Sequence, residues 1–351
     1  MIARAAALVL VCCAAQAAAQ GFAGLGKTAE GYREVAAGVP IVFPRDRGAH
    51  PDFRIEWWYL TANLTASDGR RFGAQWTLFR AALTPESLVE GWSSRQVWMG
   101  HAAVTSEKTH RFAEKFARGG VGQSGVSAAP FAAWIDDWEL AAADSDGASD
   151  ELAVSASGDG FGYRLRLTGA MTPVLHGDAG YSVKTESGKA SYYYSRPFLQ
   201  AEGTLRLDGT EIAVSGNAWL DREWSSQPLD ARQGGWDWAA IHFDSGEKLM
   251  VFRVRVNDGG DFRSGTWIAR DGSAEEIAAS DIRLAPLDRH VVGGRTLPLR
   301  WRLSIPSRAL DVELSPLNPD SWMGTYFPYW EGPVTVTGNR PGQGYLEMTG
   351  Y

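Results

Sequence analysis

The stretch "WWYLTANLTASDGRRFGAQWTLFR" (57–80) predicts the fold most directly. Two strand-like runs lie on either side of an Asp-Gly pair at 68–69. Asp-Gly favours the tight turn of an antiparallel hairpin, because glycine tolerates a positive φ there. The stretch therefore predicts two paired strands.

The same pattern continues along the chain. Apolar and polar residues alternate at 163–168, 300–305 and 310–314, which is typical of strands with one buried and one wet face. Further Asp-Gly pairs begin at positions 146, 159, 208, 258 and 271. Helical periodicity is almost absent, so we expect an all-β, antiparallel protein built as a barrel or a sandwich.

The chain also resembles itself. Residues 57–80 and 236–255 share one order of features: an aromatic pair, a strand, a turn with an acidic residue and glycine, and a second strand. In addition, "SGNAWLD" (215–221) is similar to "GQGYLEM" (342–348). A polar segment with Pro and Gly, 225–235, separates the copies. We expect a lead segment at 20–45 and two β domains in tandem, 46–228 and 229–351. We expect the insertion at 85–148 to form strands with long loops that cover one end of the first domain.

The N-terminus is typical of an exported protein. Arg4 precedes an apolar run at 5–15, which predicts a cleavable signal peptide over 1–19 and a periplasmic or secreted location. Both cysteines lie in that segment, so we expect no disulfide after cleavage. The formal net charge of -7 disfavours nucleic acid as a partner, and transient contact with a membrane or an exporter is left open.

Common catalytic motifs are missing from the sequence. It contains no Gly-x-Ser-x-Gly elbow, no His-Glu-x-x-His and no phosphate loop, and the six histidines show no metal-ligand spacing. We therefore expect neither a metal nor an organic cofactor.

The 15 tryptophans suggest cores or a cavity for an apolar ligand. Adjacent strand residues face opposite ways, so one of Trp57 and Trp58 points inward and the other faces out or toward the neighbouring domain. His242 shares a face with Trp238 and would point into the second barrel. The candidate ligand-binding residues are Trp57, Trp58, Tyr59, Trp219, Trp224, Trp236, Trp238 and His242.

The stretch "NAWLDREWSSQP" (217–228) places charges among these aromatics. On a strand, Asp221 and Glu223 share one face with Trp219, and Arg222 lies opposite. A carboxyl group beside indoles in a dry cavity has a raised pKa and can act as a Brønsted acid. The alternative is structural: one acid pairs with an arginine across the two domains, or Arg222 itself ties the domains together. The candidate catalytic residues are Asp221, Glu223 and Tyr194.

The motifs "EWWYLTANL", "YYYSRP", "WLDREWSSQPL" and the terminal "YWEGPVTVTG" together resemble the carotenoid 1,2-hydratase-like superfamily. The similarity is greater to its AttH branch of exported proteins, often called predicted secreted hydrolases, and it extends over about 41–351. It implies two lipocalin-like β-barrels packed together. It also implies cofactor-free hydration, in which an acid protonates an alkene and water captures the cation. The hydrolase name gains no support, because no nucleophile constellation is visible.

Two hypotheses follow. The first is a hydratase-like enzyme for a hydrophobic isoprenoid or acyl-type molecule, with Asp221 or Glu223 as proton donor and Tyr194 orienting water or substrate. The second is a periplasmic carrier that binds such a molecule without changing it. The tryptophans favour both equally, and replacement of the two acids discriminates between them.

Overall fold

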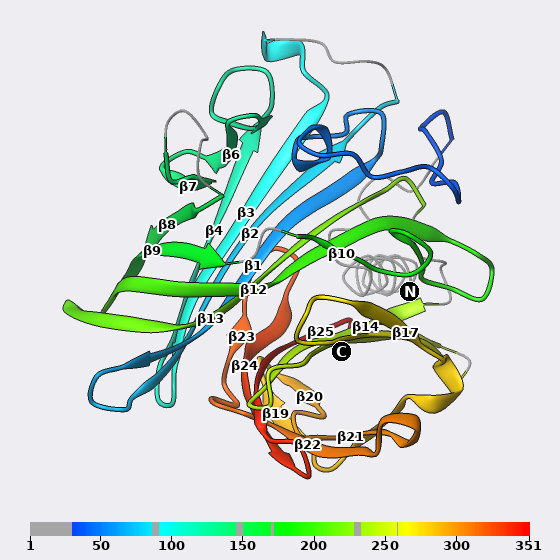
Figure 1. Ribbon diagram of the computed structural model, residues 1–351. Helices are drawn as coiled ribbons and strands as arrows, with labels where there is room; N and C mark the ends of the chain where they lie inside the picture. The colour runs from blue at the N-terminus through cyan, green and yellow to red at the C-terminus, as the bar shows by residue number, and fades with distance from the viewer. Residues whose placement is uncertain (1–29, 86–90, 145–149, 170–171, 228–232, 258) are drawn as a thin grey trace, which may run out of the picture.

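The computed structural model describes residues 30–85, 91–144, 150–169, 172–227, 233–257 and 259–351. Two large antiparallel sheets dominate this part of the chain (Figure 1). The first sheet has the strand order β4-β3-β2-β1-β13-β12-β9-β8-β7-β6-β5, with β10 and β11 paired to β12. The second has the order β17-β16-β15-β14-β25-β24-β22-β21-β18, with β23 paired to β24.

The strands of the first sheet are β1 (Ile55–Ala66), β2 (Arg71–Ala82), β3 (Gln96–Ser106), β4 (His110–Arg118), β5 (Ser124–Ala128), β6 (Phe131–Ile135), β7 (Trp138–Ala142), β8 (Leu152–Gly158), β9 (Phe161–Gly169), β10 (Val174–Leu175), β11 (Tyr181–Val183), β12 (Ala190–Leu207) and β13 (Thr210–Ser225). Those of the second sheet are β14 (Gln233–Phe243), β15 (Lys248–Val256), β16 (Asp261–Ile268), β17 (Ala274–Ile277), β18 (Arg283–Pro286), β21 (Trp301–Ile305), β22 (Leu310–Pro316), β23 (Trp322–Met323), β24 (Tyr329–Gly338) and β25 (Gly342–Thr349). A small hairpin, β19 (His290–Val292) and β20 (Arg295–Leu297), and four short 3₁₀ turns at Arg45–Arg47, Gly91–Ser93, Ala279–Asp281 and Pro306–Arg308 complete the described elements.

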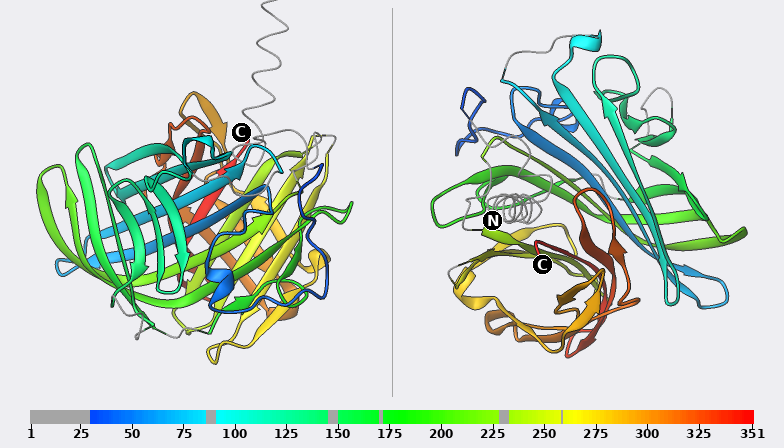
Figure 2. Two further views of the ribbon diagram at one scale, coloured as in Figure 1. Left: turned by 90° about the horizontal axis from the view of Figure 1, so that it is seen from above. Right: turned by 180° about the vertical axis from the view of Figure 1, so that it is seen from behind.

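The sequence prediction of an all-β, two-barrel fold is confirmed. The second sheet curls into a nearly closed barrel, and the first forms a wider half-barrel beside it (Figure 2). Asp-Gly pairs form the turns of the hairpins β1–β2, β8–β9, β12–β13 and β16–β17. Gly69, with φ of +85°, shows why glycine is needed at such a turn. The pairs at 146 and 258 lie wholly or partly outside the described residues.

The strand pairing repeats between the sheets. The first strand of each opening hairpin also pairs with the last strand of its sheet: β1 with β13, and β14 with β25. This repeated topology agrees with the internal resemblance in the sequence. The first sheet ends at Ser225 and the second begins at Gln233.

The prediction for the insertion at 85–148 is wrong in one respect. Its described residues form β3 to β7, which are strands of the first sheet itself rather than loops over one end. Strand β3 extends the ladder of β2 from Phe72↔Ser106 to Ala82↔Gln96. Residues 86–90 and 145–148, like the predicted signal peptide at 1–19 and part of the lead segment, lie outside the described residues.

Each sheet encloses its own apolar core, and a third cluster joins the two. Alternate residues of β1 and β13 face the first core, including Trp58 and Leu220. Residues of the opposite face, including Tyr59 and Trp219, pack against Trp238 from the second sheet. The two sheets therefore meet face to face along β1, β12 and β13 on one side and β14, β15 and β25 on the other. In the described part of the chain, no helix combines the length and apolar character needed to cross a bilayer.

Candidate active site

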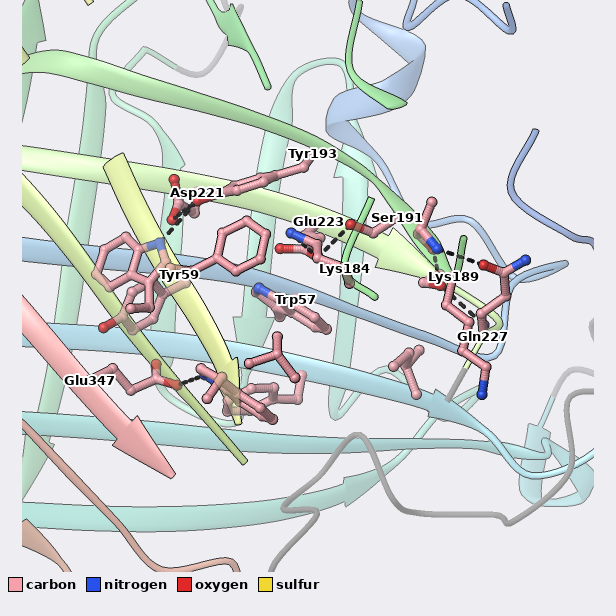
Figure 3. A pocket seen from close by; sticks show the side chains of 18 of the residues that line it. Trp57, Tyr59, Lys184, Lys189, Ser191, Tyr193, Asp221, Glu223, Gln227 and Glu347 are labelled. Atoms are coloured by element: carbon pink, nitrogen blue, oxygen red, sulfur yellow. Dashed lines mark hydrogen bonds and ion pairs between the residues drawn. The ribbon is translucent and has the colours of Figure 1, made fainter. Parts of the chain in front are cut away.

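A pocket of about 130 Å³ lies where the two sheets meet (Figure 3). Its apolar walls include Ile55, Trp57, Phe79, Trp236, Trp238, Phe252 and Val254. Its polar lining includes Tyr59, Lys184, Lys189, Ser191, Tyr193, Asp221, Glu223, Gln227 and Glu347. An engineered cavity of about 150 Å³ in another protein holds benzene, so this volume suits one end of a small hydrophobic molecule.

Strand alternation brings the acids to this pocket. In the ladder between β1 and β13, Tyr59 pairs with Asp221 and Trp57 pairs with Glu223. All four side chains line the pocket. Their neighbours Trp58 and Arg222 point to the opposite face, as the period of two requires.

Asp221 is held by three donors. Its carboxylate accepts hydrogen bonds from the indole N–H of Trp219 at 2.6 Å, from the Tyr193 hydroxyl at 2.8 Å and from the Ser195 hydroxyl. Burial raises the pKa of Asp221 to about 7; these three donors oppose the rise and the charge of Glu223 adds to it. Near neutral pH, the group therefore exists in both the protonated and the ionised form.

A buried histidine supports this arrangement from behind. His176 Nε2 lies 2.6 Å from the Ser195 hydroxyl, and its Nδ1 lies 2.8 Å from the Thr266 hydroxyl on β16. Burial, and then the nearby charge of Lys184, hold the pKa of His176 well below its ordinary value, so the imidazole is neutral. A hydrogen-bonded chain thus runs from the second sheet through His176 and Ser195 to Asp221.

Glu223 has a different environment from Asp221. Its carboxylate lies 3.1 Å from the Lys184 ammonium and accepts a hydrogen bond from Ser191 at 2.5 Å. That ammonium also lies 4.4 Å from the ring centroid of Tyr193. Of the two acids, Glu223 therefore forms the ion pair. Its partner is Lys184 of the same domain, and not an arginine of the other domain as the structural alternative expected. Among the described residues, Asp221 forms no ion pair.

The second sheet contributes two further acids, Glu331 and Glu347, which pair across β24 and β25. Glu347 accepts a hydrogen bond from the Trp236 indole at 2.6 Å. Burial raises the pKa of Glu347 to about 7, and the charges of Asp221 and Glu223 add to the rise. Burial and then the charge of Glu347 raise the pKa of Glu331 well above its ordinary value, which favours its protonated form.

The two domains interact in a reciprocal way. The Tyr59 hydroxyl of the first sheet donates to Glu331 of the second, and the Trp238 indole of the second donates to the Tyr193 hydroxyl of the first at 3.1 Å.

In the internal repeat, "WLD" (219–221) corresponds to "YLE" (345–347), so Glu347 occupies the position of Asp221. Sequence reasoning missed Glu347, although the repeat it identified could have revealed it.

The predicted site residues fall on both faces of the first sheet. Trp57, Tyr59, Trp236 and Trp238 line the pocket together with Asp221 and Glu223, and Trp219 contacts Asp221 from the side. Trp58, Trp224 and Tyr194 lie on the opposite face, away from the pocket. The tyrosine that contacts Asp221 is Tyr193, so the prediction of Tyr194 was wrong by one residue, which on a strand means the wrong face.

Arg222 does not tie the domains together. It donates to Glu56 and to the backbone oxygen of Gly48 at 2.6 Å, and its guanidinium lies 3.8 Å from the Trp58 ring centroid. Glu56 also binds Arg80. All these groups belong to the first domain, where they join β1, β2 and β13 to the segment before β1.

The prediction for His242 is half right. It shares a face with Trp238, but this face packs against the first sheet and not into the second barrel. Its ring lies 5.7 Å from that of Trp219, and burial lowers its pKa to about 3. His242 stands behind Trp219 and outside the pocket. No cluster of three or more His, Cys, Asp or Glu side chains suited to a metal ion occurs among the described residues.

Two curled antiparallel sheets with a pocket between them define a two-domain, lipocalin-like protein. A profile of the AttH-like family matches residues 34–351, and the chain belongs to that family. Comparison with curated proteins finds no match.

Solved structures agree with this assignment. A protein from Nitrosomonas europaea described as AttH is 30% identical, with a TM-score of 0.80 over 91% of this chain and 99% of that one. Kievitone hydratase from Nectria haematococca is 18% identical, with a TM-score of 0.66 over 91% and 96% of the two chains. CghA, solved with Sch210972, is 14% identical, with a TM-score of 0.55 over 94% and 97%. The last two similarities show a shared fold.

Proposed function

We propose that the pocket between the sheets binds a hydrophobic, unsaturated molecule of isoprenoid or acyl type, and that Asp221 protonates its double bond. The observation that carries this proposal is a carboxyl group with a pKa raised to about 7 in the wall of a largely aromatic pocket. An aspartate with an ordinary pKa is almost fully ionised at neutral pH and has no proton to give.

The proposed reaction is the addition of water. The proton of Asp221 passes to one carbon of the double bond, and the π electron pair forms the new C–H bond. The other carbon becomes a cation, which the aromatic side chains of the pocket wall, Trp57 and Trp238 among them, would stabilise. Water binds that carbon through its oxygen and releases a proton, which restores the Asp221 carboxyl group. The net change is one water added to the substrate.

The groups around Asp221 suit this role. The donors Trp219, Tyr193 and Ser195 all bind the carboxylate, so they stabilise the form that exists after the proton has left. Glu223 is less suited to donate a proton, because its carboxylate is already bound by the Lys184 ammonium and the Ser191 hydroxyl. We therefore assign the acid role to Asp221 and a structural role to Glu223.

The similarity to kievitone hydratase supports hydration as the reaction class. We also propose that the protein acts in the periplasm or outside the cell; Arg4 and the apolar run at 5–15 support this location.

The test uses wild type and Asp221→Asn, each incubated with a lipid extract of the source cells in isotopically labelled water. We expect the wild type to produce a species heavier by one labelled water, detected by mass spectrometry. The variant should retain the unsaturated precursor in native mass spectrometry and produce no labelled species. Glu223→Gln is the matched control, since it should keep measurable turnover.

Two outcomes contradict the proposal. If both proteins hold the same unmodified lipophile and neither produces a labelled species, the protein is a carrier. If neither protein binds a lipophile, the pocket is not a site for hydrophobic molecules.

A further inference from the structure

A second pocket lies on the other face of the strands that form the first one. It has a volume of about 120 Å³ and sits inside the half-barrel of the first sheet, next to the segment that precedes β1. Its apolar walls are Phe43, Trp58, Phe131, Leu152, Pro173 and Leu220, and its polar lining is Arg47, Tyr194, Arg196 and Arg222. We call it the inner pocket. No acidic side chain is part of its lining.

The inner pocket carries an excess of positive charge. Arg222 is neutralised by Glu56, but that carboxylate is shared with Arg80. Arg47 lies 3.9 Å from the largely exposed carboxylate of Asp150. Arg47, Arg196 and Arg222 line the pocket together with the buried Tyr194, whose phenol also experiences the negative charge of Asp46.

Arg196 has the least satisfied environment of the three. Its side chain lines the pocket and the residue is only 6% exposed. Its one polar contact among the described residues is the backbone oxygen of Asp150, at 3.4 Å, and its Nε has no hydrogen-bond partner there. The Nε of Arg222 is equally unpartnered within the described residues. The charge of Asp150 acts on Arg196, but no ion pair joins the two side chains among the described residues. Burying a guanidinium without a paired carboxylate costs free energy, which a bound anion would offset.

We propose that the inner pocket is a binding site for the carboxylate of a small amphiphilic acid. The planar carboxylate matches the fork of the Arg196 guanidinium. The apolar body of the acid would lie against Phe131, Leu152 and Leu220. A dianionic phosphate suits the pocket less, because most of the lining is apolar. The proposal is independent of the hydration reaction, since the two pockets lie on opposite faces of β1, β12 and β13.

The test is a calorimetric titration of the full mature chain with decanoate, with decanol and decylamine as neutral and cationic controls. We expect decanoate to bind at least about tenfold more tightly than either control, which is the effect of one charge-assisted contact. Arg196→Met keeps the volume of the side chain and removes its charge; it should weaken decanoate binding about 10- to 100-fold. Arg206→Met, an exposed position on the same strand, is the matched control and should bind like the wild type.

A further pair of variants separates the two pockets and guards against misfolding. Arg196→Lys preserves the charge but not the fork, and we expect an intermediate affinity. Lys184→Met alters the pocket between the sheets and should leave decanoate binding unchanged. The proposal is overturned if decanoate binds no more tightly than decanol, if inorganic phosphate binds and decanoate does not, or if Lys184→Met rather than Arg196→Met removes binding.

Discussion

Replacement of Asp221 by asparagine should make the protein more stable above neutral pH. In the unfolded chain, Asp221 releases its proton near the ordinary value of 3.8, whereas in the folded chain it does so at about 7. Between these values the folded state holds a proton that the unfolded state has lost. Stability therefore falls as the pH rises through this window, and the full penalty is present above it.

The magnitude follows from the shift. About three pKa units at about 1.4 kcal/mol per unit correspond to about 4 kcal/mol in the free energy of unfolding. Asparagine resembles the protonated acid and lacks this penalty, but it weakens the bonds from Tyr193, Ser195 and Trp219 by about 1–2 kcal/mol in total. We expect Asp221→Asn to be about 2–3 kcal/mol more stable than wild type near pH 8 and about 1–2 kcal/mol less stable near pH 4.

Urea unfolding followed by tryptophan fluorescence at several pH values measures this difference. Asp311→Asn, at a surface carboxylate paired with Arg302, is the control, and its difference from wild type should stay constant above about pH 5. The reasoning is refuted if the difference between Asp221→Asn and wild type does not change with pH, or if the variant is less stable at every pH.

Three further predictions follow. Glu347→Gln should also gain stability relative to wild type as the pH rises, by about 3 kcal/mol in the free energy of unfolding between pH 4.5 and 7, because burial raises the pKa of Glu347 to about 7. The same urea unfolding experiments measure this change, and a difference from wild type that does not vary with pH would argue against it. Tyr193→Phe removes a donor from the carboxylate of Asp221 and should raise its pKa by about one further unit, observable by infrared titration; an unchanged or lower pKa would contradict the assignment. Glu56→Gln leaves Arg222 and a second arginine without their buried acid and should cost about 3–5 kcal/mol in chemical unfolding, so a loss below about 1 kcal/mol would show that this pair is not structural.

The sequence predicted the fold well because the fold depends on local patterns. Alternation and Asp-Gly turns depend only on near neighbours, and they located the hairpins β1–β2 and β12–β13. The same period of two placed Asp221 and Glu223 on one face and Arg222 on the other, as observed. The insertion at 85–148 was misread, because the position of a strand in a sheet depends on long-range pairing.

The site was predicted only in part for the same reason. The residue opposite Asp221 on β12 is Ser195, and a change of one residue in that register exchanges Tyr193 for Tyr194. No local pattern reveals the register of two strands whose sequences are both rich in aromatics. His176 was missed because its role comes from Ser195 and Thr266, which are far from it in the sequence. The side chain of His242 points toward the first sheet because that face of β14 packs against it, and the sequence alone does not show which face of the second barrel meets the first sheet.

The account depends on Asp221 carrying a proton close to neutral pH inside an aromatic pocket. Infrared difference spectroscopy between wild type and Asp221→Asn measures this directly, because a protonated carboxyl group has its own C=O stretching band. We predict a band in the wild type that is absent from the variant and that fades as the pH rises through about 7. Wild type and Asp221→Asn with the same C=O bands at pH values down to about 5 would contradict the assignment of Asp221 as the acid.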